Sequence, residues 1–322
     1  MTAGDPVGLG VLGARAMIFE RGLRPAIEAA EGVELVAVAA RSGPVPEGLD
    51  ALDVGGYEEV IDHPDVEAVY LPLPNGAHVP WTERAAAAGK HVLCEKPLAP
   101  TPDQARSMAD ACEAAGVVLA EAWMTPFDRR WRQAMELVSN GGIGEVRHID
   151  TSFSHIFPTD VPNYRWDPDE GGGALLDVGI YALGPSVTLW GAAPAEVSAS
   201  VRVTDRGVDA TTSVHLVWPG CRSASALVSF ELPEQQRIQV VGTEGRLVLD
   251  GPAHTGGPEA TEIHLQDRDG DWHVMTTDGG APYRMMVEAF GRAVRGTEPW
   301  PRSPARAIEL AELLDRIAKA AS

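Results

Sequence analysis

The sequence predicts an α/β Rossmann domain followed by an α+β domain with a large, mainly antiparallel open sheet. Two observations support this fold class. From residue 7 to about 124, short apolar runs alternate with helical patterns, an order that builds a parallel sheet covered on both faces. After a helix expected at about 128–140, strand patterns follow one another across short turns, which is typical of antiparallel sheets. We therefore divide the chain into a first domain at 1–124 and a second domain at 125–322.

The elements of the first domain follow from apolar runs and from local helix-end signals. The helix before the fifth strand has a capping box formed by Thr101 and Gln104, a proline at its first position (Pro102) and a glycine that can end it (Gly116). Cys112 lies on the apolar stripe of this helix, so we interpret it as a small core residue. The five strands are expected at 7–12, 35–40, 66–71, 91–94 and 117–122.

In the second domain, strand patterns follow one another with no helix between most of them. We therefore predict an antiparallel meander. These strands are expected at 146–157, 196–204, 210–218, 222–230, 236–242 and 245–250. Two helices close the chain, one around Met286 and Phe290 and one that starts at Ser303-Pro304. Both present apolar stripes that we assign to the core.

Composition restricts the classes of partner. The 322 residues include 26 Lys+Arg and 46 Asp+Glu, a net charge of −20, and the sequence pI is 4.8. Such a surface repels phosphate backbones and anionic lipids, so we expect small-molecule or protein partners, no nucleic acid and no membrane. The cysteines Cys94, Cys112 and Cys221 are too few and too scattered for a disulfide framework or a zinc cluster, so we expect no metal and a cytoplasmic location.

A glycine pattern near the N-terminus points to a dinucleotide site. Gly8, Gly10 and Gly13 match G-x-G-x-x-G, but the first two fall inside the first predicted strand and cannot form the turn before a helix. The turn should begin at Gly13, so that backbone N–H groups face a pyrophosphate. Arg15 stands where a second glycine is usual, and its side chain would hinder close approach of a phosphate unless it points away and lends its charge to that phosphate. The residues expected to face the coenzyme here are Gly13, Ala14, Arg15 and Ala16.

The end of the second strand bears on coenzyme choice. A fold that selects NAD places a carboxylate here to hold the ribose 2′-hydroxyl, but the sequence reads Ala40-Arg41-Ser42. Arg41 and Ser42 could instead hold a 2′-phosphate through a guanidinium fork and a hydroxyl. The sequence therefore favours NADP(H), with NAD(H) as the alternative coenzyme. In the other interpretation, Arg41 is simply a solvated residue at a strand end.

Two further segments carry groups suited to chemistry. Cys94-Glu95-Lys96-Pro97 delivers a lysine at the carboxyl end of the fourth strand, the edge where open α/β sheets place their ligands. Residues 171–181 begin with three glycines and continue as a helix on which Asp177 and Tyr181, four apart, share a face. A carboxylate and a phenol thus project side by side.

These motifs, in this order and spacing, resemble the Gfo/Idh/MocA family of NAD(P)-dependent oxidoreductases over nearly the whole chain. The motifs are the Gly13 turn and residues 70–78, 89–97, 121–124, 142–146 and 171–181. Family members often have a histidine where this chain has Tyr181, which resembles the branch of dihydrodiol dehydrogenase and sugar oxidoreductases. The resemblance implies that Lys96 and Tyr181 are the catalytic pair, that Asp177 positions or binds substrate, and that the open sheet forms a homodimer or homotetramer.

The resemblance also implies further site residues. The coenzyme residues carried over are Pro72, Leu73, Asn75, His78, Glu95 and Lys96, and the substrate residues are Trp123, Phe127, His155, Arg165, Trp166 and Asp177. His78 could equally be an exposed residue at a helix start, and Tyr164-Arg165-Trp166 could equally anchor a loop. Met124-Thr125-Pro126-Phe127-Asp128 replaces the Met-Tyr-Arg-Phe-His common in that branch, so substrate specificity is not carried over.

The expected reaction moves a hydride to or from a hydroxyl or ketone carbon of a sugar, cyclitol or dihydrodiol. Proton transfer at the oxygen requires an acid/base group within hydrogen-bond reach. An ammonium near a phenol favours the phenolate, and Lys96 could also stabilise alkoxide character on the reacting oxygen. Two alternatives from the same family remain: a dinucleotide-sensing regulator without catalysis, and redox-assisted glycoside hydrolysis.

Overall fold

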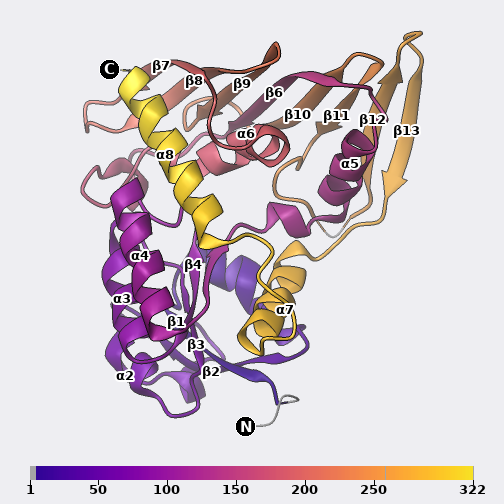
Figure 1. Cartoon of the computed structure of the whole chain (residues 1–322). Helices are drawn as coiled ribbons and strands as arrows, with labels where there is room; N and C mark the ends of the chain where they lie inside the picture. The colour runs from indigo at the N-terminus through magenta and orange to yellow at the C-terminus, as the bar shows by residue number, and fades with distance from the viewer. Residues whose placement is uncertain (1–4, 258, 322) are drawn as a thin grey trace. The chain divides into compact units, whose positions relative to one another are not determined.

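The fold is described from a computed structural model, which covers residues 5–257 and 259–321 (Figure 1). The chain divides into two compact units, one formed by the residues up to Trp123 together with Tyr283–Ala311, and the other by Met124–Pro282 together with the residues from Glu312 onward. The sequence division assigned all residues after 124 to the second domain. In the structure, Tyr283–Ala311 packs with the first unit instead.

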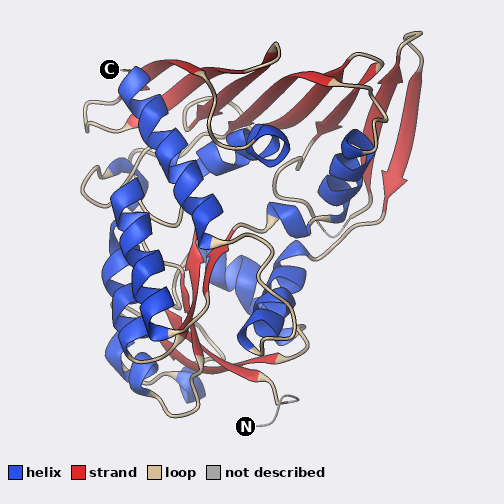
Figure 2. Ribbon diagram, in the orientation of Figure 1, coloured by secondary structure: helices blue, strands red, loops and turns tan. Residues whose placement is uncertain are grey.

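The first unit contains a five-stranded parallel sheet in the order β2-β1-β3-β4-β5 (Figure 2). The Rossmann prediction is therefore confirmed. Because the chain moves from β1 outward to β2 and then returns to β3 on the other side, the strand order reverses beside β1, and ligands of such sheets bind at the carboxyl ends of the strands there. The strands are β1 (Val7–Leu12), β2 (Val33–Ala39), β3 (Ala68–Leu71), β4 (His91–Glu95) and β5 (Leu119–Ala122).

Helices surround this sheet, and the ends of α4 (Pro102–Ala115) follow the local signals. The Thr101 hydroxyl accepts the Gln104 N–H at 3.3 Å, and Gly116 ends the same helix with φ +68°, so the predicted cap residues are confirmed. After β1, a π-helical turn (η1, Phe19–Leu23) leads into the first helix. The helices of this unit are α1 (Arg24–Glu28), α2 (Tyr57–Asp62), α3 (His78–Ala87), α4 (Pro102–Ala115) and most of α7 (Pro282–Val294).

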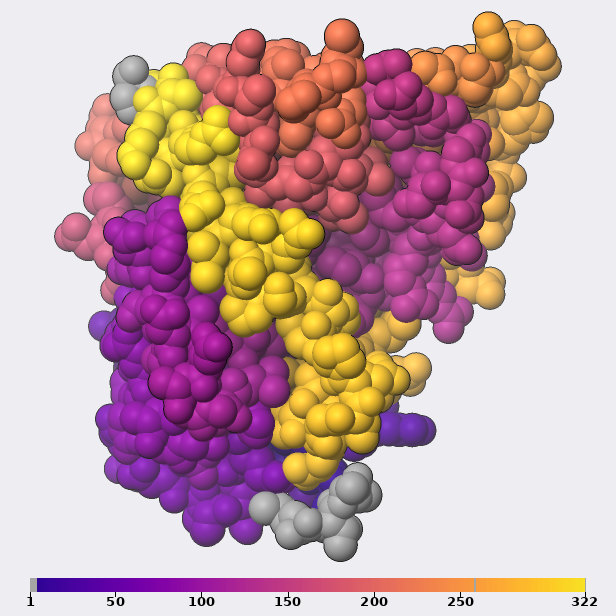
Figure 3. Space-filling view, viewed as in Figure 1, coloured from indigo at the N-terminus to yellow at the C-terminus, as the bar shows by residue number. Residues whose placement is uncertain are grey.

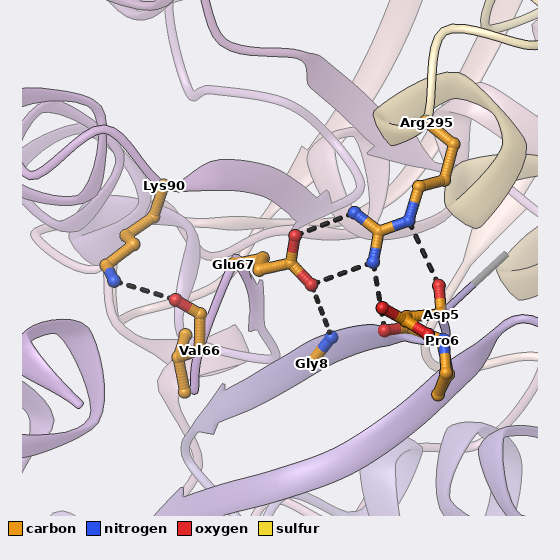
Figure 4. A network of polar contacts seen from close by, with 7 residues as sticks. All are labelled: Asp5, Pro6, Gly8, Val66, Glu67, Lys90 and Arg295. Carbon is orange, nitrogen blue, oxygen red and sulfur yellow. Dashed lines mark hydrogen bonds and ion pairs between the residues drawn. The ribbon is translucent and has the colours of Figure 1, made fainter. Parts of the chain in front are cut away.

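Arg295, which follows α7, ties the C-terminal segment to the first unit (Figure 4). Its guanidinium donates to both carboxylate oxygens of Glu67, at 2.6 and 2.8 Å, and to the backbone carbonyls of Asp5 and Pro6. The same Glu67 carboxylate accepts the Gly8 N–H at 3.3 Å. This forked ion pair is one link between the Rossmann sheet and Tyr283–Ala311, which is part of the yellow surface in Figure 3.

The second unit contains an eight-stranded sheet in the order β13-β12-β11-β10-β6-β9-β8-β7. The α+β prediction is confirmed, but the simple meander is wrong, because β6 inserts between β9 and β10 and pairs parallel with β9. Two strands were not predicted, β12 and β13. The strands are β6 (Val146–Ser154), β7 (Glu196–Val203), β8 (Asp209–Trp218), β9 (Arg222–Ser229), β10 (Gln235–Gly242), β11 (Gly245–Asp250), β12 (Thr261–Asp267) and β13 (Trp272–Thr277).

Helices cover one face of this second sheet. Helix α6 (Ala174–Trp190) packs on β6, β8 and β9, and α5 (Arg129–Ser139) packs on β12. The Asp128 carboxylate accepts the Trp131 N–H at 2.9 Å and so caps α5. Helix α8 (Pro304–Ala320) begins in the first unit and ends in the second.

Candidate functional site

The turn after β1 closes on the neighbouring strand. Gly13 has φ +114°, and a Cβ at this position would lie 3.2 Å from the Pro72 carbonyl oxygen. The N–H groups of Gly13 and Ala14 both donate to the Ala39 carbonyl, at 2.9 and 3.0 Å, and the Ala16 N–H donates back to Gly13. The structure thus uses three of the four predicted pyrophosphate donors to close the turn. Of the four, the Arg15 N–H has no partner in the described part of the chain.

Arg15 and the end of β2 form an exposed polar edge. The Arg15 side chain donates from Nη1 to the Ser42 carbonyl at 3.2 Å, so it turns toward the loop that follows β2. Arg41 and Ser42 are exposed on this loop. Burial raises the pKa of Tyr57, although the nearby Arg41 opposes that shift. No carboxylate follows β2 before Glu47, as the sequence indicated.

The catalytic lysine candidate lies in a tightly held turn after β4. Glu95 is buried at the end of this strand, and its carboxylate accepts the Tyr70 hydroxyl at 2.7 Å and the Lys96 N–H at 3.2 Å. Burial, together with the Glu95 carboxylate, raises the pKa of Tyr70 well above its usual value, so Tyr70 remains a neutral donor. Glu95 therefore fixes the backbone at Lys96, and Lys96 itself is half-buried.

His78 holds the other side of this turn. Its Nε2 lies 3.0 Å from the Leu73 carbonyl, and its Nδ1 lies 3.1 Å from the Pro97 carbonyl and 3.2 Å from the Leu98 carbonyl. The side chain is fully buried, so the interpretation as an exposed helix-start residue is wrong. Burial lowers the pKa of His78, and the Lys96 charge adds to this effect. His78 thus joins the loop after β3 to the lysine turn, and Asn75 is buried in that same loop.

Sequence reasoning missed a third support of the turn, Glu121 on β5. Its carboxylate accepts the Leu98 N–H at 2.8 Å and pairs with Arg302 through its second oxygen. The Arg302 guanidinium also lies over the Trp123 ring, 5.4 Å from its centroid, and Trp123 is buried. A carboxylate within the buried strand Leu119–Ala122 is the sequence signal that could have identified this role.

In the second unit, a glycine run and Asp209 position the start of α6. The Leu175 N–H donates to the Asp209 carboxylate at 2.8 Å, and Thr212 donates to the same oxygen at 2.8 Å. Gly173 has φ +112°, and a Cβ there would lie 2.2 Å from Asp209 Oδ1. The glycine therefore lets the carboxylate reach the helix end. Burial raises the pKa of Asp209, although these hydrogen bonds oppose the shift, and sequence reasoning did not identify this cap.

Asp177 lies on the first turns of α6 and is paired with Arg165. The Arg165 Nε donates to Asp177 Oδ2 at 2.6 Å, and the two side chains are 19% and 5% exposed. The guanidinium lies over the rings of Tyr164 and Phe157, 4.6 and 5.1 Å from their centroids. Arg165 thus both neutralises the buried carboxylate and fixes its direction.

Tyr181, one turn further along α6, lies in an aromatic cluster. Its ring stacks on Phe153 with centroids 4.9 Å apart, and Phe153 in turn contacts His254 at 5.5 Å. His155, directly after the end of β6, contacts Phe153, Phe230 and Phe157. This cluster holds the phenol ring of Tyr181 in one orientation.

The remaining substrate candidates are mostly core residues of this unit. Trp166 is buried, and its Nε1 donates to the Pro158 carbonyl at 2.8 Å, which favours the loop-anchor interpretation. Phe127 is buried in the short turn before α5. Within residues 5–257 and 259–321, no three His, Cys, Asp or Glu side chains gather as metal ligands. No helix in the described chain is long and apolar enough to cross a membrane.

Family comparisons match both parts of the chain. The model described as an oxidoreductase family with an NAD-binding Rossmann fold matches residues 7–122, and the model of the GFO/IDH/MocA C-terminal domain matches residues 131–248. A D-xylose 1-dehydrogenase (NADP(+)) from Haloferax volcanii is 36% identical over 294 residues, which are 90% of this chain and 89% of that protein. The chain belongs to the GFO/IDH/MocA oxidoreductase family.

Other relatives of this GFO/IDH/MocA protein modify sugars. A dTDP-3,4-didehydro-2,6-dideoxy-alpha-D-glucose 3-reductase from Streptomyces violaceoruber is 33% identical over 326 residues, covering 97% of this chain and 95% of that protein. The crystal structure of KijD10, a 3-ketoreductase from Actinomadura kijaniata in complex with NADP and TDP-benzene, superposes with a TM-score of 0.92 at 29% identity and 98% coverage of both chains. The family resemblance inferred from the motifs is confirmed.

Proposed function

We propose that this protein is an NADP(H)-dependent oxidoreductase that transfers hydride to or from a hydroxyl or ketone carbon of a sugar-like substrate, with Lys96 and Tyr181 as the catalytic pair. The observation that carries the proposal is the lysine turn after β4. Three buried side chains on three different elements, Glu95, His78 and Glu121, fix its backbone. Such support from several elements is typical of a catalytic group that must hold one position.

The first unit has the features that a dinucleotide requires. The glycine at position 13 lets the turn after β1 pack closely on Pro72 and Leu73 at the carboxyl edge of the sheet, and the Arg15 N–H of this turn is left for a phosphate oxygen. The exposed Arg41 and Ser42 suit a 2′-phosphate, and two of the similar proteins, the D-xylose 1-dehydrogenase (NADP(+)) and KijD10 in complex with NADP, support this coenzyme. When bound, the coenzyme supplies hydride exchange at its nicotinamide ring.

The roles of the two proposed catalytic residues follow from their chemistry. Lys96 carries an ammonium that would donate a hydrogen bond to the reacting oxygen and favour its alkoxide form. Tyr181 would accept or donate the proton at that oxygen. Asp177, held by Arg165, would orient a substrate hydroxyl as a hydrogen-bond acceptor. Sugars present several such hydroxyls, and the activities named for the relatives support this substrate class.

The experiment is a panel of aldoses, polyols and nucleotide-linked ketosugars, monitored by nicotinamide absorbance with NAD(H) and NADP(H) side by side. Lys96→Met and Tyr181→Phe should each lower kcat by about 100-fold or more, while the NADPH Kd stays within about threefold. The double variant should lose little beyond the worse single variant, because the two groups act on one proton transfer. Lys319→Met, an exposed residue paired with Asp315, is the matched control.

Two outcomes would contradict the assignment. Unchanged turnover in Lys96→Met would remove the lysine from the mechanism. Coenzyme binding with no turnover on any substrate would favour a dinucleotide-sensing regulator, and glycoside cleavage without net oxidation would favour a redox-assisted glycosidase.

We also propose that the protein forms a homo-oligomer through the face of the large sheet opposite α6. This face presents small polar residues, among them Ser198, Ser213 and Ser225, around a shallow depression that Arg237 also lines. Small side chains let two sheets approach closely. Light scattering should give the mass of a dimer or tetramer, and Ser213→Arg should shift it toward the monomer. A monomeric wild-type protein would contradict the proposal.

A further inference from the structure

Arg15 leaves the turn after β1 and reaches the loop after β2. Its Nη1 donates to the Ser42 carbonyl at 3.2 Å. Gly43, with φ +71°, lies directly beside the guanidinium, since a Cβ on Gly43 would come 2.2 Å from Nη1. The side chain therefore lies away from its own turn and next to the residues that follow β2.

The charge of Arg15 is not compensated by an ion pair. Arg84, by comparison, is paired with the carboxylates of Glu58 and Asp62. Arg15 is exposed and forms no ion pair with any residue from 5–257 or 259–321. A guanidinium has five N–H donors, and the hydrogen bond to the Ser42 carbonyl uses only one of them. In a chain with a net charge of −20, this site stands out as cationic.

From this geometry we propose that Arg15 is a specificity-determining residue that binds the 2′-phosphate of NADP(H). We assign to the same site Arg41 and the Ser42 hydroxyl, which lie on the loop that the Arg15 guanidinium reaches. A phosphate monoester dianion satisfies these donors and offsets the repulsion between the two cations. NADH instead presents a ribose hydroxyl, for which no carboxylate acceptor stands between residues 40 and 46. The inference rests on the proposed function.

The competing assignment is the pyrophosphate, which both coenzymes carry. The two assignments differ in one measurable way. A 2′-phosphate contact is present with NADPH and absent with NADH, whereas a pyrophosphate contact is present with both. Comparing the two coenzymes in the same variant therefore isolates the 2′-phosphate without reference to turnover.

The test measures the Kd of NADPH and NADH by fluorescence titration, and the Kd of 2′,5′-ADP and 5′-AMP by calorimetry. Arg15→Ala should raise the Kd of NADPH and of 2′,5′-ADP by about 10-fold, the scale of one charge-assisted hydrogen bond. The Kd of NADH and 5′-AMP should stay within about twofold, and the salt dependence of NADPH binding should become shallower. Arg15→Lys should recover part of the loss, because the ammonium keeps the charge.

Two more variants control the result. Gly43→Ala places a methyl group against the guanidinium, so it should weaken NADPH binding and leave NADH binding unchanged. Arg106→Ala, an exposed arginine of α4 paired with Asp103, should change neither Kd. Thermal melts establish that each variant is folded.

The possible results separate this inference from the proposed function. If Arg15→Ala weakens NADPH and NADH equally, Arg15 contacts the pyrophosphate and the inference is overturned while the proposed function stands. If neither Kd changes in Arg15→Ala, the inference is likewise overturned. If the wild-type protein binds neither coenzyme, the proposed function fails and the inference fails with it.

Discussion

The carboxylate of Glu121 accepts the backbone N–H of Leu98 at 2.8 Å, two residues after the proposed catalytic lysine. Its second oxygen pairs with Arg302, and the two side chains are 2% and 15% exposed. The C-terminal segment thus supplies the counter-charge for a carboxylate that supports the turn after β4. The ion pair is therefore a second link between Tyr283–Ala311 and the Rossmann unit, besides the pair of Arg295 with Glu67.

Removing one partner of this pair should destabilise the protein strongly. Arg302→Met and Glu121→Gln should each lower the free energy of unfolding by about 3 kcal/mol, because each leaves a buried charge uncompensated. The double variant should cost clearly less than the sum of the two. Urea unfolding of the four proteins measures the coupling, with Arg106→Met as an exposed control expected to cost below about 1 kcal/mol. Additive losses would show that the two groups do not act as a pair.

His78 should act as a positioning residue for the lysine turn. Replacing it by leucine leaves the Leu73 and Pro97 carbonyls facing an apolar group, which should lower the free energy of unfolding by about 2 kcal/mol. Displacement of Lys96 should also lower kcat by about 10-fold or more. His78→Gln keeps an amide donor and should recover part of both losses. Full activity and stability in the leucine variant would show that the contacts do not hold the turn.

The first two glycines of the G-x-G-x-x-G match serve packing. A Cβ on Gly8 would lie 2.0 Å from the Asp65 carbonyl oxygen, and a Cβ on Gly10 would lie 2.5 Å from a methyl group of Val60. Gly8→Ala should therefore lower the free energy of unfolding by about 3 kcal/mol, and Gly10→Ala by less, because a side chain yields more readily than backbone. Neither should change the NADPH Kd below the melting range. Weaker coenzyme binding at unchanged stability would assign these glycines to the site.

The parts of the fold that the sequence could predict have local causes. The strands β1 and β4 are continuous apolar runs, and Thr101 and Gly116 bound α4 through contacts within one helix. Strand β13 could not be found in this way, because its residues are mostly exposed and Trp272 and Val274 are about half accessible to solvent. The parallel pairing of β6 with β9 was also hidden, since an alternating pattern does not identify a strand's neighbour.

In the candidate site, too, the sequence predicted the features with local causes and missed the long-range ones. Asp177 and Tyr181 were placed on one helix face by their spacing alone, and both lie on α6 as expected. The groups that hold the site residues come from distant positions: Asp209 caps α6 from β8, and Arg302 reaches Glu121 across 181 positions of sequence. Hydrophobic periodicity and cap residues carry no information about pairs this far apart in the sequence. The sequence therefore predicted the candidate catalytic side chains but not the residues that hold them in place.

His254 should make the protein less stable in mild acid. The side chain is fully buried beside Phe153, its Nε2 contacts the Ser152 carbonyl at 3.0 Å, and its Nδ1 has no hydrogen-bond partner among the described residues. Burial lowers the pKa of His254 to about 4, from an ordinary value of 6.5. As the pH falls through this window, the unfolded chain binds a proton that the folded chain resists, so stability is lost; at pH 5 the loss is about 2 kcal/mol.

Urea unfolding of wild type and His254→Asn at pH 7.5, 6 and 5 measures this loss. The asparagine keeps a neutral amide donor but cannot take up the proton, so the variant should lose about 2 kcal/mol less than wild type between pH 7.5 and pH 5. Burial also lowers the pKa of His78, which gives a loss of the same sign in both proteins. Burial raises the pKa of Asp209, which gives an opposite contribution in both. The difference between the two proteins therefore isolates His254, and equal pH dependence would show that its imidazole stays as easily protonated in the folded state as in the unfolded chain.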